Sequence, residues 1–90
     1  MLERTIEAYL VKRVKAIGGE VRKVKWIGRN GAPDRLVMTP MWTVWVELKR
    51  PGKKAEPHQA REHARMRVMN QRAVVIDSMT GVDALIEGTL

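Results

Sequence analysis

Hydrophobic residues recur through the first fifth of the chain at the 3.6-residue period of an α-helix. This helix is predicted over residues 2–17, and its apolar face is formed by Ile6, Leu10, Val14 and Ile17. The pair Gly18-Gly19 predicts its end, because glycine favours the C-terminal end of a helix. Glu3 and Glu7 lie on the side of the apolar row. There they either stabilise the helix by interacting with its dipole or reach toward a site on a neighbouring sheet.

After the glycines the pattern changes to the two-residue alternation of a strand. Residues 21–27 place Val24 and Trp26 on one face and Lys23 and Lys25 on the other, which predicts a first strand. The segment that follows is rich in glycine and ends in proline, so it is predicted to be a loop that aims the next residue, Asp34.

A β-hairpin is predicted over residues 34–39 and 42–48, because both segments are rich in β-branched and aromatic residues and flank Pro40-Met41. Proline cannot adopt the positive φ of a type I′ turn, so a type I turn is expected. If Thr39 faces Trp42, counting outward places Asp34 opposite Glu47. The Cβ atoms of such a pair are roughly 4.5–5.5 Å apart.

The second half of the chain predicts a helix, a buried strand and a short closing helix, at residues 57–71, 73–77 and 83–87. Ser78 or Thr80 is expected to cap the last helix. The apolar residues expected to pack the longer helix on the sheet are Ala60, Ala64, Met66, Val68 and Met69. The order α-β-β-β-α-β-α predicts a single α/β domain over residues 1–90, with a central mixed sheet flanked by helices.

Composition narrows the class of protein. Ninety residues allow only a modest core, so a homodimer is a reasonable expectation. The absence of cysteine excludes disulfides and thiolate metal sites. No apolar run reaches the roughly 18 residues of a membrane span, and the acidic start is unlike a signal peptide. We therefore expect a soluble cytoplasmic protein with no membrane partner.

The net charge of +7 and the pI of about 10.4 favour a polyanionic partner over a merely solvated basic surface. Basic residues occur in every part of the chain up to Arg72, which favours a folded surface that follows phosphates rather than a basic tail. The candidate DNA contacts are Lys23, Lys25, Arg29, Arg50, Lys53, Lys54, Arg61 and Arg65.

The hairpin also carries residues suited to phosphodiester hydrolysis. Asp34 and Glu47, facing each other, could hold one hard cation, and the backbone carbonyl of Leu48 is a possible further ligand. Oxygen ligands favour Mg²⁺ or Mn²⁺. Lys49 shares the face of Glu47 and could orient the attacking water or counter developing charge. Each piece is common by chance, but their shared face and basic surroundings favour a metal-dependent nuclease site.

These segments resemble the PD-(D/E)xK nuclease superfamily, and within it the small VRR-NUC domains related to Holliday-junction resolvases. The matching motifs are the acid-bearing first helix, Gly31-Ala-Pro-Asp34, Val46-Glu-Leu-Lys49 and Gln59 after the basic Pro-Gly turn. The resemblance implies a restriction-endonuclease-like core and metal-dependent cleavage of DNA, with branched DNA such as junctions or flaps as substrate. It also suggests a bacterial or phage-type protein.

The resemblance further implies roles for single residues. Asp34 and Glu47 would be metal ligands, Lys49 the catalytic lysine and Gln59 a supporting residue. The first-helix acid of the site would be Glu3 or Glu7, and both are retained.

The residues alone also allow other interpretations of the histidines, the tryptophans and the function. His58 and His63 are five residues apart and do not match a helical zinc pair, which favours surface positions for both. At least two of Trp26, Trp42 and Trp45 are expected to pack in the core rather than stack on bases. A non-catalytic DNA-binding module on the same fold is the main alternative function. An RNA-directed nuclease or a translation-associated protein is a weaker one.

Overall fold

The predicted order of elements is confirmed in the computed structural model, which describes residues 1–90. The elements are α1 (Glu3–Ala16), β1 (Glu20–Lys23), β2 (Arg35–Met38), β3 (Thr43–Leu48), α2 (Pro57–Val68), β4 (Ala73–Ile76) and α3 (Met79–Glu87). The last helix begins four residues earlier than expected, and the hydroxyl of Ser78 caps it by accepting a hydrogen bond from the Gly81 N–H at 2.9 Å. None of the three helices is both long and apolar enough to cross a membrane.

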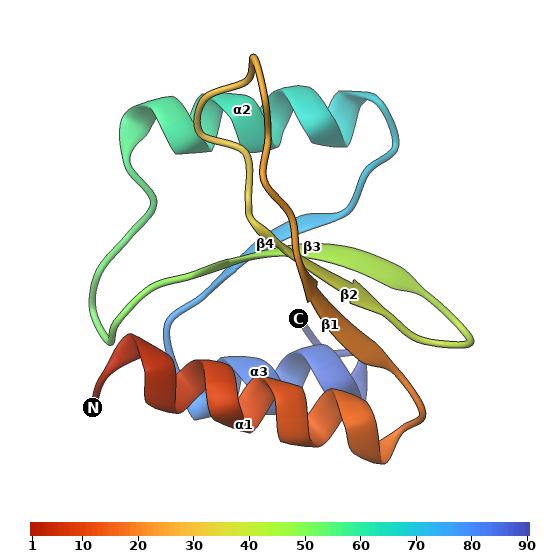
Figure 1. Cartoon of the computed structure of the whole chain (residues 1–90). Coiled ribbons are helices and arrows are strands. Elements are labelled where there is room, and N and C mark those ends of the chain that lie inside the picture. The colour runs from red at the N-terminus through yellow and green to blue at the C-terminus, as the bar shows by residue number, and fades with distance from the viewer.

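The four strands form one mixed sheet in the order β1-β2-β3-β4. The first three are antiparallel neighbours, and β4 joins β3 in parallel after the chain has crossed over through α2. Figure 1 shows α1 and α3 together on one face of the sheet and α2 alone on the other. The hairpin expected from the sequence, β2 and β3, is therefore the centre of the sheet.

The register predicted for the hairpin is confirmed. Arg35 pairs with Val46 and Met38 with Thr43, which places Thr39 opposite Trp42 at the turn. The Thr39 N–H donates to the Trp42 carbonyl at 2.9 Å, and the Thr39 hydroxyl accepts the Trp42 N–H at 3.0 Å. One hydroxyl thus closes the turn around Pro40.

The main core lies between the sheet and the pair α1 and α3. Every second residue of β3 points into it, and so does every third or fourth residue of α1, as the two periodicities require. Its buried residues are Ile6, Leu10, Val14, Val37, Val44, Val46, Leu48, Ile76, Val82 and Leu85. Because one face of the sheet holds this apolar core, the other face is available for polar groups.

Helix α2 covers that second face with polar residues, contrary to the prediction. Of the five residues predicted to pack there, Met66 is buried as predicted, but Ala60, Ala64, Val68 and Met69 are exposed. The other two buried residues of the helix are Glu62 and His63. Positions 62, 63 and 66 recur at helical spacing, so the helix does present one regular face to the sheet. Two of the three residues on that face are polar, so the pattern of apolar residues in the sequence could not show which face of the helix packs on the sheet.

The tryptophans serve packing, as expected. Trp26 and Trp45 lie against each other beneath α2, with ring centroids 5.0 Å apart, and Trp42 packs against the main core. The indole N–H of Trp26 donates to the Pro33 carbonyl at 2.9 Å. This bond belongs to a loop, because β1 ends at Lys23 rather than at residue 27, and only the Val24 N–H extends the pairing, to the Asp34 carbonyl.

The loop between β1 and β2 leaves the sheet and rises beside α2 (Figure 1). Gly31 is the point of close approach. Its φ is +86°, and a Cβ there would lie 2.9 Å from the His58 carbonyl oxygen and 3.2 Å from the Gln59 Cα. Glycine is therefore required both by the positive φ and by the lack of room for a Cβ. It allows the loop to pack against the start of α2 just before Asp34.

Candidate active site

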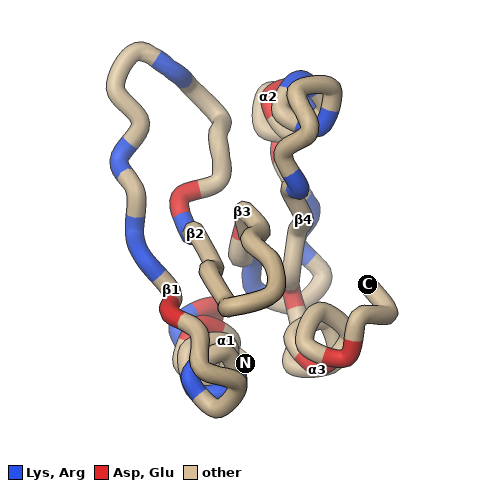
Figure 2. Tube along the Cα trace, turned by 90° about the vertical axis from the view of Figure 1, so that its right-hand side faces the viewer, with Lys and Arg blue, Asp and Glu red and all other residues tan.

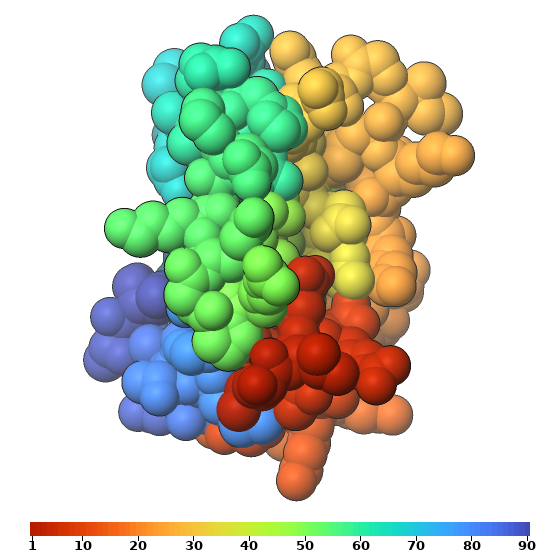
Figure 3. All heavy atoms as spheres, turned by 90° about the vertical axis from the view of Figure 1, so that its left-hand side faces the viewer, coloured from red at the N-terminus to blue at the C-terminus, as the bar shows by residue number.

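The hairpin brings Asp34 and Glu47 to one face of the sheet. Extending the observed register by one residue beyond Arg35 and Val46 places the two acids opposite each other, on the face covered by α2. The Glu47 side chain is 12% exposed, and that of Asp34 is 58% exposed. Figure 3 shows this side of the molecule, where the start of α1, the segment around residue 34 (yellow) and the turn before α2 meet.

The Glu47 carboxylate is largely buried and has no partner within hydrogen-bond distance. The Lys49 Nζ lies 3.9 Å from its Oε2, and the His63 Nε2 lies 3.7 Å from its Oε1, both beyond hydrogen-bond distance. Burial raises the pKa of Glu47, and the negative charges of Asp34 and Glu3 add to the rise although Lys49 opposes it. A carboxylate in this state is stabilised by a nearby cation.

Asp34 is held by its neighbour Arg35. The Arg35 Nη1 lies 2.7 Å from the Asp34 Oδ1, and the same guanidinium pairs with Glu7 of α1. The Arg35 side chain is largely buried, so this pairing fixes Glu7 on the α1 side of the sheet. Sequence reasoning assigned no role to Arg35, since a single arginine in a strand gives no signal of its partners.

The two acids of the first helix are thus in different situations. Glu7 is paired with Arg35, whereas Glu3 is exposed, has no ion pair, and is close enough for its charge to raise the pKa of Glu47. Of the two candidates, Glu3 is therefore the one whose carboxylate is free of an internal ion pair.

The backbone beside Glu47 provides a further oxygen. The register places Pro33 opposite Leu48, and proline has no N–H with which to pair the Leu48 carbonyl. The neighbouring Lys49 N–H donates instead to Ile76 of β4, at 2.9 Å, so the even-numbered residues of β3 turn their backbone groups toward β2. No backbone N–H at position 33 can therefore pair with the Leu48 carbonyl, which makes this oxygen a candidate ligand.

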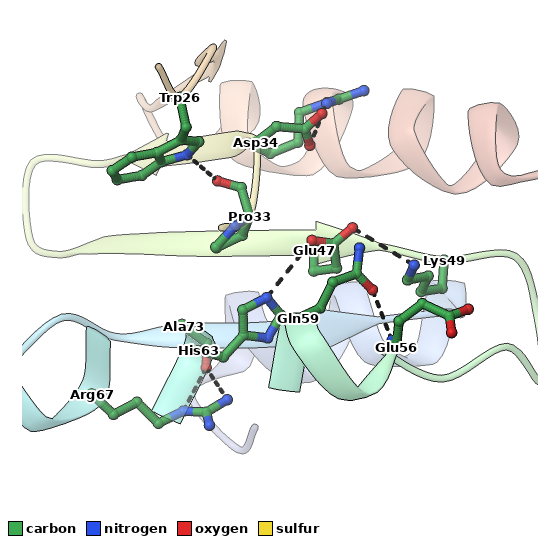
Figure 4. A network of polar contacts seen from close by, with 11 residues as sticks. Trp26, Pro33, Asp34, Glu47, Lys49, Glu56, Gln59, His63, Arg67 and Ala73 are labelled. Carbon is green, nitrogen blue, oxygen red and sulfur yellow. Dashed lines mark hydrogen bonds and ion pairs between the residues drawn. The ribbon is translucent and has the colours of Figure 1, made fainter. Parts of the chain in front are cut away.

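Gln59 lies in the first turn of α2, beside the acids. Its Oε1 accepts the Glu56 N–H at 2.8 Å, which caps the helix. In Figure 4 the amide nitrogen of Gln59 points into the space between Glu47 and Lys49. The capping bond fixes the orientation of this side chain, so its N–H groups face the site.

His63 is the residue that sequence reasoning placed wrongly. His58 is on the surface as expected, but the His63 side chain is 1% exposed and faces Glu47 (Figure 4). Burial and the charge of Arg67 lower its pKa, although Glu62 and the Gly31 backbone oppose this. The four-residue spacing between Gln59 and His63 could have revealed it, because residues four apart share one face of a helix.

The residues present fit a hard cation only in part. No group of three His, Cys, Asp or Glu side chains is gathered closely enough to hold a metal ion. Asp34 and Glu47 with the Leu48 carbonyl are a set of oxygen ligands, and Mg²⁺ often binds to one or two carboxylates while it keeps several waters. Binding would require the Asp34 carboxylate to turn from Arg35 toward Glu47.

The eight candidate DNA contacts are all exposed. Arg29 and Arg65 lie 3.5 and 3.7 Å from Glu62, and Lys53 lies 3.6 Å from Glu56, while the other five have no ion pair. Figure 2 shows basic residues along the loop after β1 and on α2, at the end of the molecule away from α1 and α3. This distribution gives the site a basic border.

Comparison with known proteins gives two close similarities, although no family model matches the chain. A solved structure described as "VRR_NUC domain" superposes with a TM-score of 0.87 at 41% identity, covering 98% of this chain and 97% of the other. A curated protein of Acyrthosiphon pisum secondary endosymbiont phage 1, named "Putative nuclease p44", is 46% identical over 77 residues. That match covers 84% of this chain and 83% of the relative.

Proposed function

The chain belongs to the VRR-NUC family of nuclease domains, and we propose that it is a Mg²⁺- or Mn²⁺-dependent DNA endonuclease that prefers branched DNA. The observation that carries the proposal is the pair of acids, Asp34 and Glu47, on one sheet face with Lys49 beside them. The Glu47 side chain is largely buried and its pKa is raised although the Lys49 Nζ lies 3.9 Å away, which favours a role in holding a cation.

The metal ligands in this proposal are the carboxylates of Asp34 and Glu47 and the carbonyl of Leu48, with Glu3 at the edge of the site. A divalent ion bound there would supply charge neutralisation at the phosphoryl oxygens and a lower pKa for a coordinated water. Lys49 extends from the same strand face and would orient the attacking water or counter the charge that develops on phosphorus. Gln59 would fix the position of Glu47, because its free amide N–H groups can donate to that carboxylate.

DNA binding is proposed for the basic border of the site. Lys23, Lys25, Arg50, Lys54 and Arg61 are exposed and free of ion pairs, so they can contact phosphates without breaking an internal contact. The net charge of +7 supports the same role. A homodimer would present two such sites to the two strands of a junction.

The test is a cleavage panel of linear duplex, single strand, flap, splayed arm and four-way junction, with Mg²⁺, Mn²⁺ or chelator. We expect cutting of the branched substrates with either metal and none with chelator. Glu47→Ala should abolish cutting, and Glu20→Ala should not, because Glu20 is an exposed acid of β1 paired with Arg22.

Two outcomes would contradict the proposal. Full activity of folded Glu47→Ala would remove Glu47 from the chemistry. Salt-sensitive binding of all the substrates with no cleavage under any metal would instead indicate a non-catalytic DNA-binding module.

A further inference from the structure

The face that α2 presents to the sheet contains an unpaired polar atom. The Nε2 of His63 is buried and has no hydrogen-bond partner, and it is the only buried side-chain nitrogen or oxygen in this condition. Burial of a polar group without a partner is costly, so such atoms are rare in folded proteins. An atom of this kind next to a catalytic carboxylate points to a partner that is acquired when the site is in use.

The nearest acceptor to this nitrogen is the carboxylate of Glu47. Its Oε1 is 3.7 Å from the His63 Nε2, whereas its Oε2 faces Lys49 at 3.9 Å. The two oxygens of Glu47 therefore face two different groups, one on α2 and one on β3 (Figure 4). A hydrogen bond to Oε1 would fix the plane of the carboxylate and leave Oε2 on the side of Lys49.

We propose that His63 is a positioning residue: its imidazole carries a proton on Nε2 when the site is in use, and this Nε2–H donates a hydrogen bond to the Glu47 Oε1 and so orients the carboxylate for binding the divalent cation. This inference rests on the proposed function, since it concerns the same site. It requires the Nε2–Oε1 distance to shorten from 3.7 Å to about 2.9 Å. Catalytic hydrogen bonds are often long before the ligands bind and then tighten.

The surroundings of His63 suit this role because they allow the imidazole little freedom. Its side chain is 1% exposed and lies between the sheet and the helix. The same helix is fastened to the loop that leads to Asp34, through the close approach of Gly31 to His58 and Gln59 and through the Arg29 and Glu62 pair. Helix α2 thus holds His63 at a fixed position next to Glu47 and is also attached to the loop that leads to Asp34.

Substitutions separate a positioning role from simple packing. His63→Leu fills a similar volume but donates no hydrogen bond. His63→Gln places an amide N–H near the position of Nε2, whereas the shorter side chain of His63→Asn cannot reach Glu47. The matched control is His58→Leu, an exposed histidine on the same helix.

The measurement is the affinity of the DNA-free protein for Mn²⁺ by titration calorimetry, together with the melting temperature in chelator and cleavage against Mn²⁺ concentration. We expect His63→Leu and His63→Asn to weaken Mn²⁺ binding about 10–100-fold, the usual loss when the partner of a metal ligand is removed. His63→Gln should retain most of the affinity, and His58→Leu should match the wild type. High Mn²⁺ should restore much of the cleavage lost in His63→Asn.

Each outcome decides the question. Wild-type Mn²⁺ affinity in His63→Asn would overturn the inference, and so would an equal loss in His63→Gln and His63→Asn, which would indicate packing alone. If His63→Leu does not fold, the comparison of Gln with Asn still decides. If the wild-type protein neither binds Mn²⁺ nor cuts DNA, the proposed function fails and this inference fails with it.

Discussion

Replacement of Glu47 by glutamine is expected to stabilise the metal-free protein while it removes metal binding. Glutamine keeps the shape of the side chain and removes its charge. The raised pKa of Glu47 means that the folded protein favours the neutral form of this group more than the unfolded chain does, even with Lys49 nearby, since burial outweighs that attraction. Glu47→Gln supplies a permanently neutral group at the same place.

The size of the effect follows from the contacts of Glu47. Neither oxygen has a protein partner within hydrogen-bond distance, but both keep some contact with water, since the His63 Nε2 is the only fully buried side-chain atom without a partner. A fully buried polar group without a partner costs about 1–3 kcal/mol. Because 12% of the side chain remains exposed to water, the gain should lie at the lower end, about 1 kcal/mol at pH 8. For a domain of this size that corresponds to an increase of about 4–8 °C in melting temperature.

The gain should depend on pH in a defined direction. The pKa of Glu47 in the folded protein is above the ordinary value of 4.5. The wild type therefore loses stability as the pH rises from 4.5 to this higher pKa, because the carboxylate becomes charged in the folded protein. Glu47→Gln has no such loss. The difference in melting temperature should be full at pH 8 and should vanish below pH 4.5, where both side chains are neutral.

The assay is thermal unfolding in chelator and in excess Mn²⁺, with Glu20→Gln as the control for an exposed acid. Excess Mn²⁺ should raise the melting temperature of the wild type, since a ligand at 100 times its Kd stabilises by about 2.7 kcal/mol, but should leave Glu47→Gln unchanged. A lower melting temperature for Glu47→Gln at pH 8, or a difference independent of pH, would refute this account of Glu47.

Two further predictions concern the surroundings of the site. Gly31→Ala should unfold at a lower temperature than Gly28→Ala. Both residues have positive φ, but only at Gly31 would the new Cβ meet another atom, 2.9 Å away. Thermal unfolding of the two variants measures the difference, and equal melting temperatures would contradict the prediction. Glu3→Gln should lower cleavage with little loss of stability. Glu7→Gln should cost about 1–3 kcal/mol, because it removes one of the two carboxylate partners of the largely buried Arg35 and leaves only Asp34. The reverse pattern in cleavage assays and urea unfolding would show that Glu7 is the site acid.

The hairpin could be predicted in detail because its information is local. Alternation along two short segments and a proline in the turn were sufficient to fix which residues face each other, and the observed pairing of Arg35 with Val46 follows that register. The placement of Asp34 opposite Glu47 depends on this register alone. Where a strand stops was harder to predict, because Val24 and Trp26 continue the alternation of β1 but belong to the loop.

The helix over the site could not be predicted as well, because its packing depends on contacts distant in sequence. His63 and Glu62 are buried against Glu47 and Arg29, and polar residues buried by such contacts look like surface residues in a hydrophobic pattern. Arg35 presented the same difficulty, since its partner Glu7 is 28 residues away. The acids on the hairpin could therefore be found from the sequence, whereas the groups that surround them required the structure.

The central claim is that Asp34 and Glu47 together hold one divalent cation, and a crystal structure grown with Mn²⁺ tests it most directly. The anomalous signal of manganese locates the ion independently of any assumption about its ligands. We expect a peak between the two carboxylates, with the Leu48 carbonyl as a further ligand and with Asp34 turned away from Arg35. A peak bound elsewhere, or none between these acids at a Mn²⁺ concentration that supports cleavage, would contradict the claim.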